Sequence, residues 1–225
     1  MKRLLAAAIA AALLLSGCTS ASRPAESAPP TGTPSPSPTP IVTPTPEPEP
    51  ADGELVLVRD YIPGIFIDLK YATTDNFTGR VIYDSDEAYL RYGTVKKLLC
   101  AQNELSGRGL SLKIWDAYRP VSAQFKLWEI CPNPVYVSDP NNGYSKHSRA
   151  NTVDITLVTD TGESISMPSG FDDFTSLADR DYSDVSAEAA ENARLLENVM
   201  VENGFVPYSG EWWHYSDSVA YDVYG

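Results

Sequence analysis

Residues 145–158 read Ser-Lys-His-Ser-Arg-Ala-Asn-Thr-Val-Asp-Ile-Thr-Leu-Val, a polar stretch that runs into a β-branched, apolar one. The run from Val153 to Val158 is typical of a strand. Asp160-Thr161-Gly162 and then the segment 163–167 follow it, so the sequence predicts a β-hairpin here. The same stretch contains a histidine and an aspartate seven residues apart, His147 and Asp154.

The segments on both sides of this hairpin show strand and helix patterns. Short apolar, β-branched runs predict strands over 55–59, 65–69, 110–115 and 212–215. Apolar residues near helical spacing predict helices over 87–105, 121–130 and 186–203. Gly107 is expected to stop the first of these helices, and Ser186 and Gly204 are expected to cap the last. The fold class is therefore α+β, in one domain over residues 53–225.

The composition excludes some classes of partner. The chain has 17 Lys and Arg against 30 Asp and Glu, a formal net charge of −13. Phosphate contacts need clustered basic residues, so nucleic acid is not expected as a partner. The hydrophobic content of 43% is enough for a packed core.

The N-terminus has the pattern of a targeting signal. Lys2 and Arg3 precede an apolar run over 4–15, and Leu15-Ser16-Gly17-Cys18 follows. Twelve apolar residues are short for a membrane span and typical of a signal peptide. The last four residues resemble a bacterial lipobox, which implies lipidation of Cys18 after cleavage. A plain signal peptide is the alternative.

Residues 19–52 form a predicted linker. Eleven of the 18 prolines lie between Pro24 and Pro50, among Thr, Ser and Glu, with no apolar periodicity. Such a segment cannot bury enough surface to offset its chain entropy, so we expect a disordered, extended tether. The alternative is a Pro-rich recognition ligand.

Two further cysteines, Cys100 and Cys131, leave two possibilities open. Outside the cytoplasm they could form one disulfide, or they could be two buried thiols.

The only two histidines, His147 and His214, suggest a metal site. A catalytic zinc needs three protein ligands and one open position, so two histidines require a carboxylate as the third ligand. Asp154 is a suitable candidate because a loop and the start of a strand can turn both groups toward one point. Glu211, three residues before His214, could then act on water without binding the metal. A lone histidine beside aromatic residues is more often a core or surface residue, so neither histidine decides the matter alone.

Seven stretches together resemble the D-alanyl-D-alanine dipeptidases of the vancomycin-resistance type, within the zinc D,D-peptidase group. The resemblance covers most of the domain, from Asp68 to Tyr215. The stretches, given by their limits, are Asp68 to Thr73, Asp75 to Gly79, Trp115 to Pro120, Ser145 to Arg149, Val153 to Leu157, Phe171-Asp172, and Gly204-Phe205 with Glu211 to Tyr215. The resemblance implies a single compact zinc-peptidase domain with a central, mostly antiparallel sheet and flanking helices.

The resemblance also implies the roles of the site residues. His147, Asp154 and His214 match the ligands of one Zn²⁺, Glu211 matches the catalytic acid/base, and Arg119 matches the arginine that stabilises the transition state. These roles agree with the chemistry, because a carboxylate can shuttle a proton and a fixed guanidinium can hold a developing oxyanion. A salt bridge to Asp116 is the structural alternative for Arg119. Ser145 and Asp172 are weaker candidates, for gripping the ends of a small peptide, with a turn residue and a loop cap as alternatives.

Two residues beside the motif differ from the usual pattern of the group. Ala150 stands where glycine is usual, and Thr152 stands where alanine is usual. We expect Ala150 to be tolerated unless its backbone requires a positive φ.

The expected activity is zinc-dependent hydrolysis of D-Ala-D-Ala or of D-Ala-terminated cell-wall peptides. With a lipid anchor on Cys18, the enzyme would lie on the extracytoplasmic face of a bacterial cell membrane, where wall peptides are its partners. Two alternatives stay open: a D,D-carboxypeptidase acting on longer peptidoglycan stem peptides, and a non-catalytic peptide-binding lipoprotein. Retention of Glu211 and Arg119, which metal binding does not need, argues against the latter.

Overall fold

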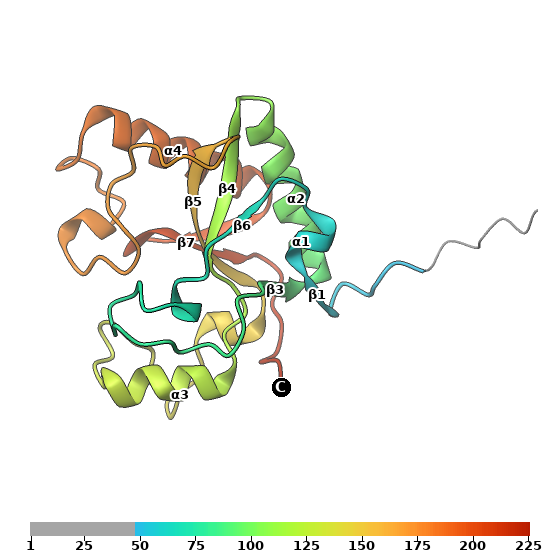
Figure 1. Ribbon diagram of the computed structural model, residues 1–225, viewed down its shortest axis with the longest axis vertical. Coiled ribbons are helices and arrows are strands. Elements are labelled where there is room, and N and C mark those ends of the chain that lie inside the picture. Colours follow the sequence, from blue (N-terminus) through green and yellow to red (C-terminus); the bar gives the residue numbers. More distant parts are fainter. Residues whose placement is uncertain (1–47) are drawn as a thin grey trace, which may run out of the picture. The chain divides into compact units, whose positions relative to one another are not determined.

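The computed structural model describes residues 48–225 (Figure 1). The predicted signal peptide, Cys18 and the linker as far as residue 47 lie outside the described residues. Among the described residues, no helix is both long and apolar enough to cross a membrane. The elements, in chain order, are β1 (Leu55–Leu57), α1 (Val58–Tyr61), β2 (Phe66–Ile67), η1 (Lys70–Ala72), β3 (Tyr89–Arg91), α2 (Tyr92–Ser106), β4 (Leu110–Asp116), α3 (Val121–Ile130), η2 (Lys146–Arg149), β5 (Thr152–Thr159), η3 (Ser176–Ala178), α4 (Ala187–Glu202), β6 (Phe205–Tyr208) and β7 (Glu211–Asp217).

The central sheet has five strands in the order β2-β4-β5-β7-β6. Only the β2–β4 pair is parallel, and the other three pairs are antiparallel. A second sheet consists of β1 and β3 alone. The predicted α+β class, with a mostly antiparallel sheet and flanking helices, is therefore confirmed.

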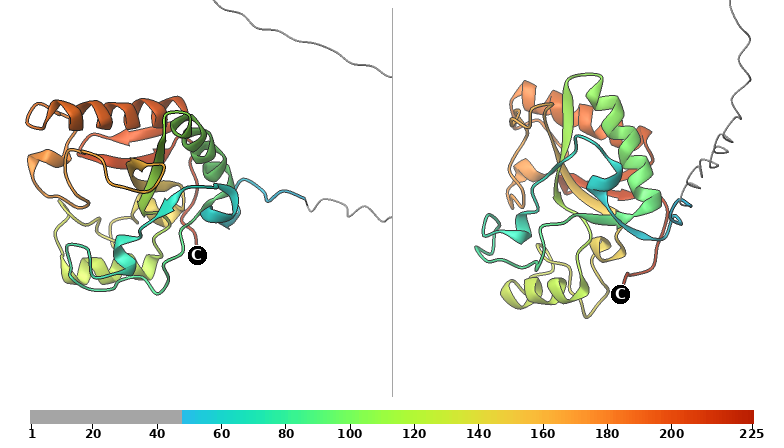
Figure 2. Two further views of the ribbon diagram at one scale, coloured as in Figure 1. Left: turned by 45° about the horizontal axis from the view of Figure 1, so that its top comes forward. Right: turned by 45° about the vertical axis from the view of Figure 1, so that its right-hand side comes forward.

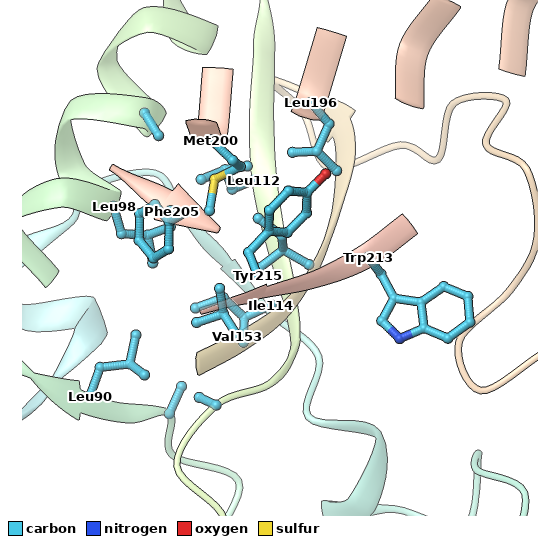
Figure 3. Close-up of a cluster of buried hydrophobic side chains, with 14 of the residues drawn as sticks. Leu90, Leu98, Leu112, Ile114, Val153, Leu196, Met200, Phe205, Trp213 and Tyr215 are labelled. Atoms are coloured by element: carbon cyan, nitrogen blue, oxygen red, sulfur yellow. The ribbon is translucent and has the colours of Figure 1, made fainter. Parts of the chain in front are cut away.

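Helices α2 and α4 pack against each other and against the sheet, α2 on β4 and α4 on β6. Between them lies the main hydrophobic core, to which Leu98, Leu112, Leu196, Met200 and Tyr215 contribute (Figure 3). Helix α3 lies on the other side of the domain from α4, with strands of the sheet between them (Figure 2). One face of the sheet is thus closed by helices, while the other faces the loops around α3 and η2.

Four predicted elements have their expected limits or nearly so. Helix α3 spans the predicted residues, and β4 and β5 differ from the prediction by one residue at their ends. Helix α4 begins after Ser186, whose hydroxyl accepts a hydrogen bond from the Ala189 amide at 3.1 Å. Gly204 follows its end with φ of 85°.

The helix predicted over 87–105 is wrong at its start. Tyr89–Arg91 form β3, and α2 begins only at Tyr92. The tertiary partners outweigh the helical periodicity here, because β3 pairs with β1 and the Arg91 amide bonds to the Ala150 carbonyl at 2.8 Å. Gly107 does cap the helix, as expected.

The hairpin predicted over 153–167 forms only in part. The turn is present, with Gly162 at φ of 87°, where a Cβ would lie 2.6 Å from the Phe66 ring. Beyond it, only Ser164 makes a β-bridge, to Val158. The strands predicted over 55–59 and 65–69 are shorter than expected, and β6 was missed.

Cys100 and Cys131 are both free thiols in the structure. Cys100 is exposed and Cys131 is half-buried, so neither the disulfide nor a pair of fully buried thiols is observed.

Candidate functional site

Asp154 and His214 lie directly opposite each other on β5 and β7. Their neighbours Val153 and Tyr215, also paired, belong to the hydrophobic core (Figure 3). Because successive side chains of a strand alternate between its faces, Asp154 and His214 point to the face away from the core.

His147 approaches the same face from η2. The Ser145 hydroxyl accepts a hydrogen bond from the His147 amide at 3.3 Å, and the His147 carbonyl accepts one from the Arg119 amide at 3.2 Å. The Nδ1 of His147 lies 2.9 Å from the Ala117 carbonyl. Because a carbonyl is an acceptor only, Nδ1 carries the proton of the neutral ring. The lone pair of Nε2 is then free to bind a metal.

The three donor groups converge to the spacing of a metal site. The His214 Nδ1 lies 2.9 Å from Asp154 Oδ1, and the His147 Nε2 lies 3.3 Å from Asp154 Oδ2 and 3.4 Å from the His214 Nδ1. A tetrahedral zinc with bonds of about 2.0–2.1 Å has ligand atoms roughly 3.3 Å apart. His147 and Asp154 are buried and His214 is half-buried. The residues present therefore fit a tetrahedral metal with one face open.

Charge also suits these residues to a cation. Burial alone would raise the pKa of the Asp154 carboxyl, but His147 and His214 beside it hold that pKa well below its usual range. Asp154 is thus an anion across the physiological pH range. Its negative charge would offset the positive charge of a bound cation, as it offsets the charge of the neighbouring imidazoles.

Glu211 reaches the site because β7 is irregular. In a regular strand, residues three apart point to opposite faces, so Glu211 and His214 could not share a site. Pro207 of β6 pairs with Tyr215, whereas the next residue, Tyr208, pairs with Glu211, so that residues 212–214 form a wide bulge. As a result the Glu211 Oε2 lies 3.4 Å from the His214 Nδ1. Burial, and then the nearby charge of Asp154, raise the pKa of Glu211.

A second bulge, at Trp115 of β4, places Asp116 opposite Asp154. The Asp116 carboxylate is fully buried and accepts hydrogen bonds from the Tyr83 hydroxyl at 2.5 Å and from Arg119 Nη2 at 2.5 Å. Bulges are frequent beside active sites, where they re-aim side chains, and both bulges have that effect here.

Arg119 is held from several sides. Its guanidinium donates to Asp116 and, at 3.0 Å, to Gln124 Oε1, and it stacks over the Tyr71 ring at 5.0 Å. Burial opposes its charge, but Asp116, Tyr83 and Tyr71 together raise the pKa of Arg119 well above its usual value. The salt bridge to Asp116 considered from the sequence exists, but it is buried, so it fixes the guanidinium beside the site. The remaining N–H groups stay available to a ligand.

The two weaker candidates have different surroundings. The Ser145 hydroxyl caps η2, as expected of a turn residue, and Ser145 also lines the pocket, as expected of a residue that contacts a peptide. Asp172 has φ of 52°, and its Oδ2 accepts a hydrogen bond of 2.6 Å from the Tyr71 hydroxyl. Burial raises the pKa of Asp172 to about 7.

A pocket of about 260 Å³ opens over the donor groups. The loop after α3 contributes one wall, and Tyr136 of this loop stacks on Phe174 with ring centroids 4.3 Å apart. The residues that line the pocket are Pro134, Val135, Tyr136, Ser138, Ser145, Lys146, Tyr208, Glu211 and His214.

The sequence profile of the family described as D-ala-D-ala dipeptidase matches residues 51–222. The chain belongs to this family.

Individual relatives agree with the assignment to the D-Ala-D-Ala dipeptidases. The D-alanyl-D-alanine dipeptidase of Escherichia coli is 39% identical over 162 residues, which are 72% of this chain and 83% of the relative. Those of Enterococcus faecium and Streptomyces coelicolor are 35% and 36% identical, over 69% and 73% of this chain and 87% and 91% of theirs. A solved structure of VanYB in complex with D-Alanine-D-Alanine matches at 17% identity and a TM-score of 0.41, over 60% of this chain and 75% of that chain. The assignment rests on the sequence matches, which make the chain an enzyme, a metallopeptidase of the dipeptidase family.

The structure brings together the five residues expected from the resemblance, together with several that sequence reasoning missed as parts of the site. Asp116 was considered only as a salt-bridge partner, although its place in the same short stretch as Arg119 was a usable signal. Tyr71 and Lys146 lie in stretches that carry the resemblance but were not singled out. The others come from segments whose sequences carry no such signal; they are Tyr83, Gln124, Tyr136 and Tyr208.

Both departures from the dipeptidase pattern have structural consequences. Ala150 ends η2 at φ of 59° and ψ of 27°, so the position meets the exception named from the sequence, and alanine is strained there. Thr152 is fully buried, and its hydroxyl lies 3.0 Å from that of Ser216 on the paired strand, so the extra polar group has a partner.

Proposed function

We propose that the chain is a zinc-dependent dipeptidase that hydrolyses D-Ala-D-Ala, or the D-Ala end of cell-wall peptides, with Glu211 as general acid/base. The observation that carries this proposal is the convergence of one ligand atom each from His147, Asp154 and His214 within 4.8 Å, with the Glu211 carboxylate beside them. Bound zinc supplies a Lewis acid that polarises the peptide carbonyl and makes water more acidic.

Glu211 is suited to move the proton. Its side chain is more than a third exposed and lines the pocket, where it can meet water and substrate. As general base it takes a proton from the attacking water, and as general acid it delivers this proton to the leaving amine. Its raised pKa brings it closer to the pH at which both transfers are efficient.

Arg119 is suited to hold the developing oxyanion. Catalysis of this kind requires donors that are already oriented before the reaction, so that no reorganisation is needed at the transition state. The bonds to Asp116 and Gln124 provide that orientation.

The charged ends of a short peptide can be matched by one carboxylate and one ammonium group of the chain. Asp172 does not line the pocket, but its charge acts on Glu211 and its carboxylate is suited to an ammonium group. The exposed Lys146 in the pocket wall is suited to a terminal carboxylate. The pocket, at about 260 Å³, is slightly smaller than the usual range of ligand sites, which begins at ~300 Å³, and this favours a dipeptide over a long stem peptide.

The test compares the wild-type domain with Glu211→Gln and, as a control, with Glu188→Gln on the exposed N-terminal turn of α4. Zinc content, and turnover of D-Ala-D-Ala and of a D-Ala-terminated pentapeptide, are measured for each protein. We expect full zinc in all three, turnover of the dipeptide by the wild type and the control, and a loss of roughly 10²–10⁴-fold in Glu211→Gln.

Other outcomes identify the alternatives. Preference for the pentapeptide would assign a D,D-carboxypeptidase. Binding of either peptide without turnover would assign a binding protein. Loss of zinc from Glu211→Gln would make Glu211 a ligand, and turnover near the wild-type rate would exclude it as the base.

A further inference from the structure

The wide bulge in β7 leaves part of the strand without its usual partners. Residues 212–214 have no counterpart on β6, so the β6 side of His214 lacks ladder hydrogen bonds. The His214 carbonyl is partly buried, and a carbonyl shielded from water without a partner is costly. An unsupported bulge would also leave Glu211 and His214 free to move. Some other group must therefore hold this segment.

Arg180, in the loop between η3 and α4, supplies those bonds. Its Nη2 donates to the His214 carbonyl at 3.2 Å, and its Nε donates to the Tyr208 carbonyl at 2.7 Å. One guanidinium thus joins the two strands where the β6–β7 ladder is interrupted, on either side of Glu211.

Arg180 is itself held by two residues on the core side of the sheet, Glu197 and Tyr215. Its Nη1 donates to Glu197 Oε2 of α4 at 2.9 Å and to the Tyr215 hydroxyl at 3.1 Å, and its guanidinium stacks over the Tyr215 ring at 4.7 Å. Figure 3 shows this hydroxyl pointing toward α4 beside Leu196. The side chain is only 11% exposed and is not among the residues that line the pocket.

We propose that Arg180 is a positioning residue for the reaction: it holds the β7 bulge in the shape that directs Glu211 and His214 to one site. It acts through the strand and does not touch substrate. A lysine could not replace it, because an ammonium cannot serve two strands, a carboxylate and an aromatic face in one plane.

The inference rests on the metal site of the proposed function, so its test measures metal binding apart from activity. Zinc affinity by chelator competition, the visible spectrum of the Co²⁺-substituted protein, and kcat and KM at saturating zinc are measured for Arg180→Ala, Arg180→Lys and Glu197→Gln. The matched control is Arg194→Ala, because Arg194 is exposed and stacks over Tyr182 at 5.3 Å without contributing to the hydrogen bonds of β6 or β7.

We expect Arg180→Ala to bind zinc roughly 10–100-fold more weakly, as is typical when a partner of a ligand is removed. Its cobalt spectrum should change, and kcat should fall more than KM rises, because Glu211 is displaced. Arg180→Lys should rescue only part of this loss, Glu197→Gln should shift each value in the same direction by a few-fold, and Arg194→Ala should match the wild type.

The inference is overturned if Arg180→Ala lowers the melting temperature but keeps the wild-type zinc affinity, cobalt spectrum and kcat, since the residue is then structural only. If Arg180→Ala does not fold, Arg180→Lys and Glu197→Gln decide in the same way. Absence of zinc binding by the wild type would instead refute the proposed function itself.

Discussion

At the scale of single residues, Asp172 combines a cost to stability with the role proposed for it in binding an ammonium group. Its carboxyl is half-buried beside the Tyr71 hydroxyl, and its pKa is raised to about 7. A carboxyl whose pKa is higher in the folded than in the unfolded state favours the folded state at low pH. This contribution is lost as pH rises through the folded pKa, here near 7.

The change Asp172→Asn separates the two effects. Asparagine accepts the Tyr71 hydrogen bond and tolerates the positive φ, so the fold is kept. We expect the variant to melt about 3–8 °C above the wild type at pH 8, and to show a much smaller gain at pH 5. Thermal unfolding of both proteins at the two pH values is the measurement, and an equal gain at both would contradict the assigned pKa.

Binding of a free ammonium should show the opposite dependence. In the wild type, KM for D-Ala-D-Ala should rise as pH falls below about 7, because a protonated Asp172 cannot pair with the substrate ammonium. In Asp172→Asn, KM should be raised at every pH and lose this dependence. Steady-state kinetics with the free and the N-acetylated dipeptide check this, since the acetylated substrate should not distinguish the two proteins.

Arg119→Lys keeps a positive charge and removes the planar fork. Because the fork is held by Asp116 and Gln124, we expect a loss of roughly 10²-fold or more in kcat with little change in KM. Arg108→Lys, at an exposed pair with Glu104, is the control and should behave as the wild type. A rise confined to KM would show that Arg119 binds the ground-state substrate.

At the scale of elements, the turn that carries His147 depends on an unusual backbone residue. Ala150 ends η2 with a positive φ and is fully buried, so a side chain there adds strain that glycine would avoid. In Ala150→Gly, relief of strain and loss of a buried methyl group oppose each other, and we expect stability within about 1 kcal/mol of the wild type.

Ala150→Val tests the same turn by adding strain, whereas Ala150→Gly relieves it. A β-branched residue fits poorly at positive φ, and the site has no exposed space for it, so we expect a loss of more than about 2 kcal/mol and weaker zinc binding. Denaturant unfolding and metal titration measure both. A valine variant as stable as the wild type would show that the turn does not hold this conformation in solution.

At the scale of the whole molecule, metal binding should be linked to folding and to pH. Zinc that binds only the folded state stabilises it, by about 2.7 kcal/mol at a free concentration of 100 Kd. Protons compete with the metal for the imidazoles, so activity should fall on the acid side of neutrality and zinc should be lost at still lower pH. Melting temperature and activity with zinc and after exhaustive chelation, across this range, are the measurements. Activity that survives chelation would refute the zinc mechanism.

We also propose that the whole protein is anchored by lipid on the extracytoplasmic face of a bacterial membrane, through Cys18. The support is the lipobox-like Leu15-Ser16-Gly17-Cys18 and the Pro-rich segment that separates it from the domain. Cys18→Ser should then lack lipid and leave the membrane fraction, while the activity of the domain stays unchanged. Mass spectrometry of the N-terminal peptide and cell fractionation check this, and recovery of the wild type entirely as soluble extracellular protein would contradict it.

Much of this protein can be predicted from its sequence. Periodicity predicted α3, α4, β4 and β5, because their apolar patterns and caps are local. The short motifs identified the family. They also named the five residues that the structure brings together, because metal ligation and proton transfer accept few side chains. The helix over 87–105 failed at Tyr89–Arg91 because strand pairing with β1 and a bond to Ala150 are not visible in that segment.

Only the tertiary structure decided how the site residues face one another. Alternation along a regular strand would have sent Glu211 and His214 to opposite faces, and the bulge in β7, where Arg180 bonds to carbonyls of both β6 and β7, reversed this. The positive φ of Ala150 and the raised pKa of Asp172 likewise depend on burial by distant segments. The sequence by itself determined which chemical groups are present, because these are encoded residue by residue. Their orientation and ionisation were decided by packing, because both depend on neighbours that only the folded chain brings together.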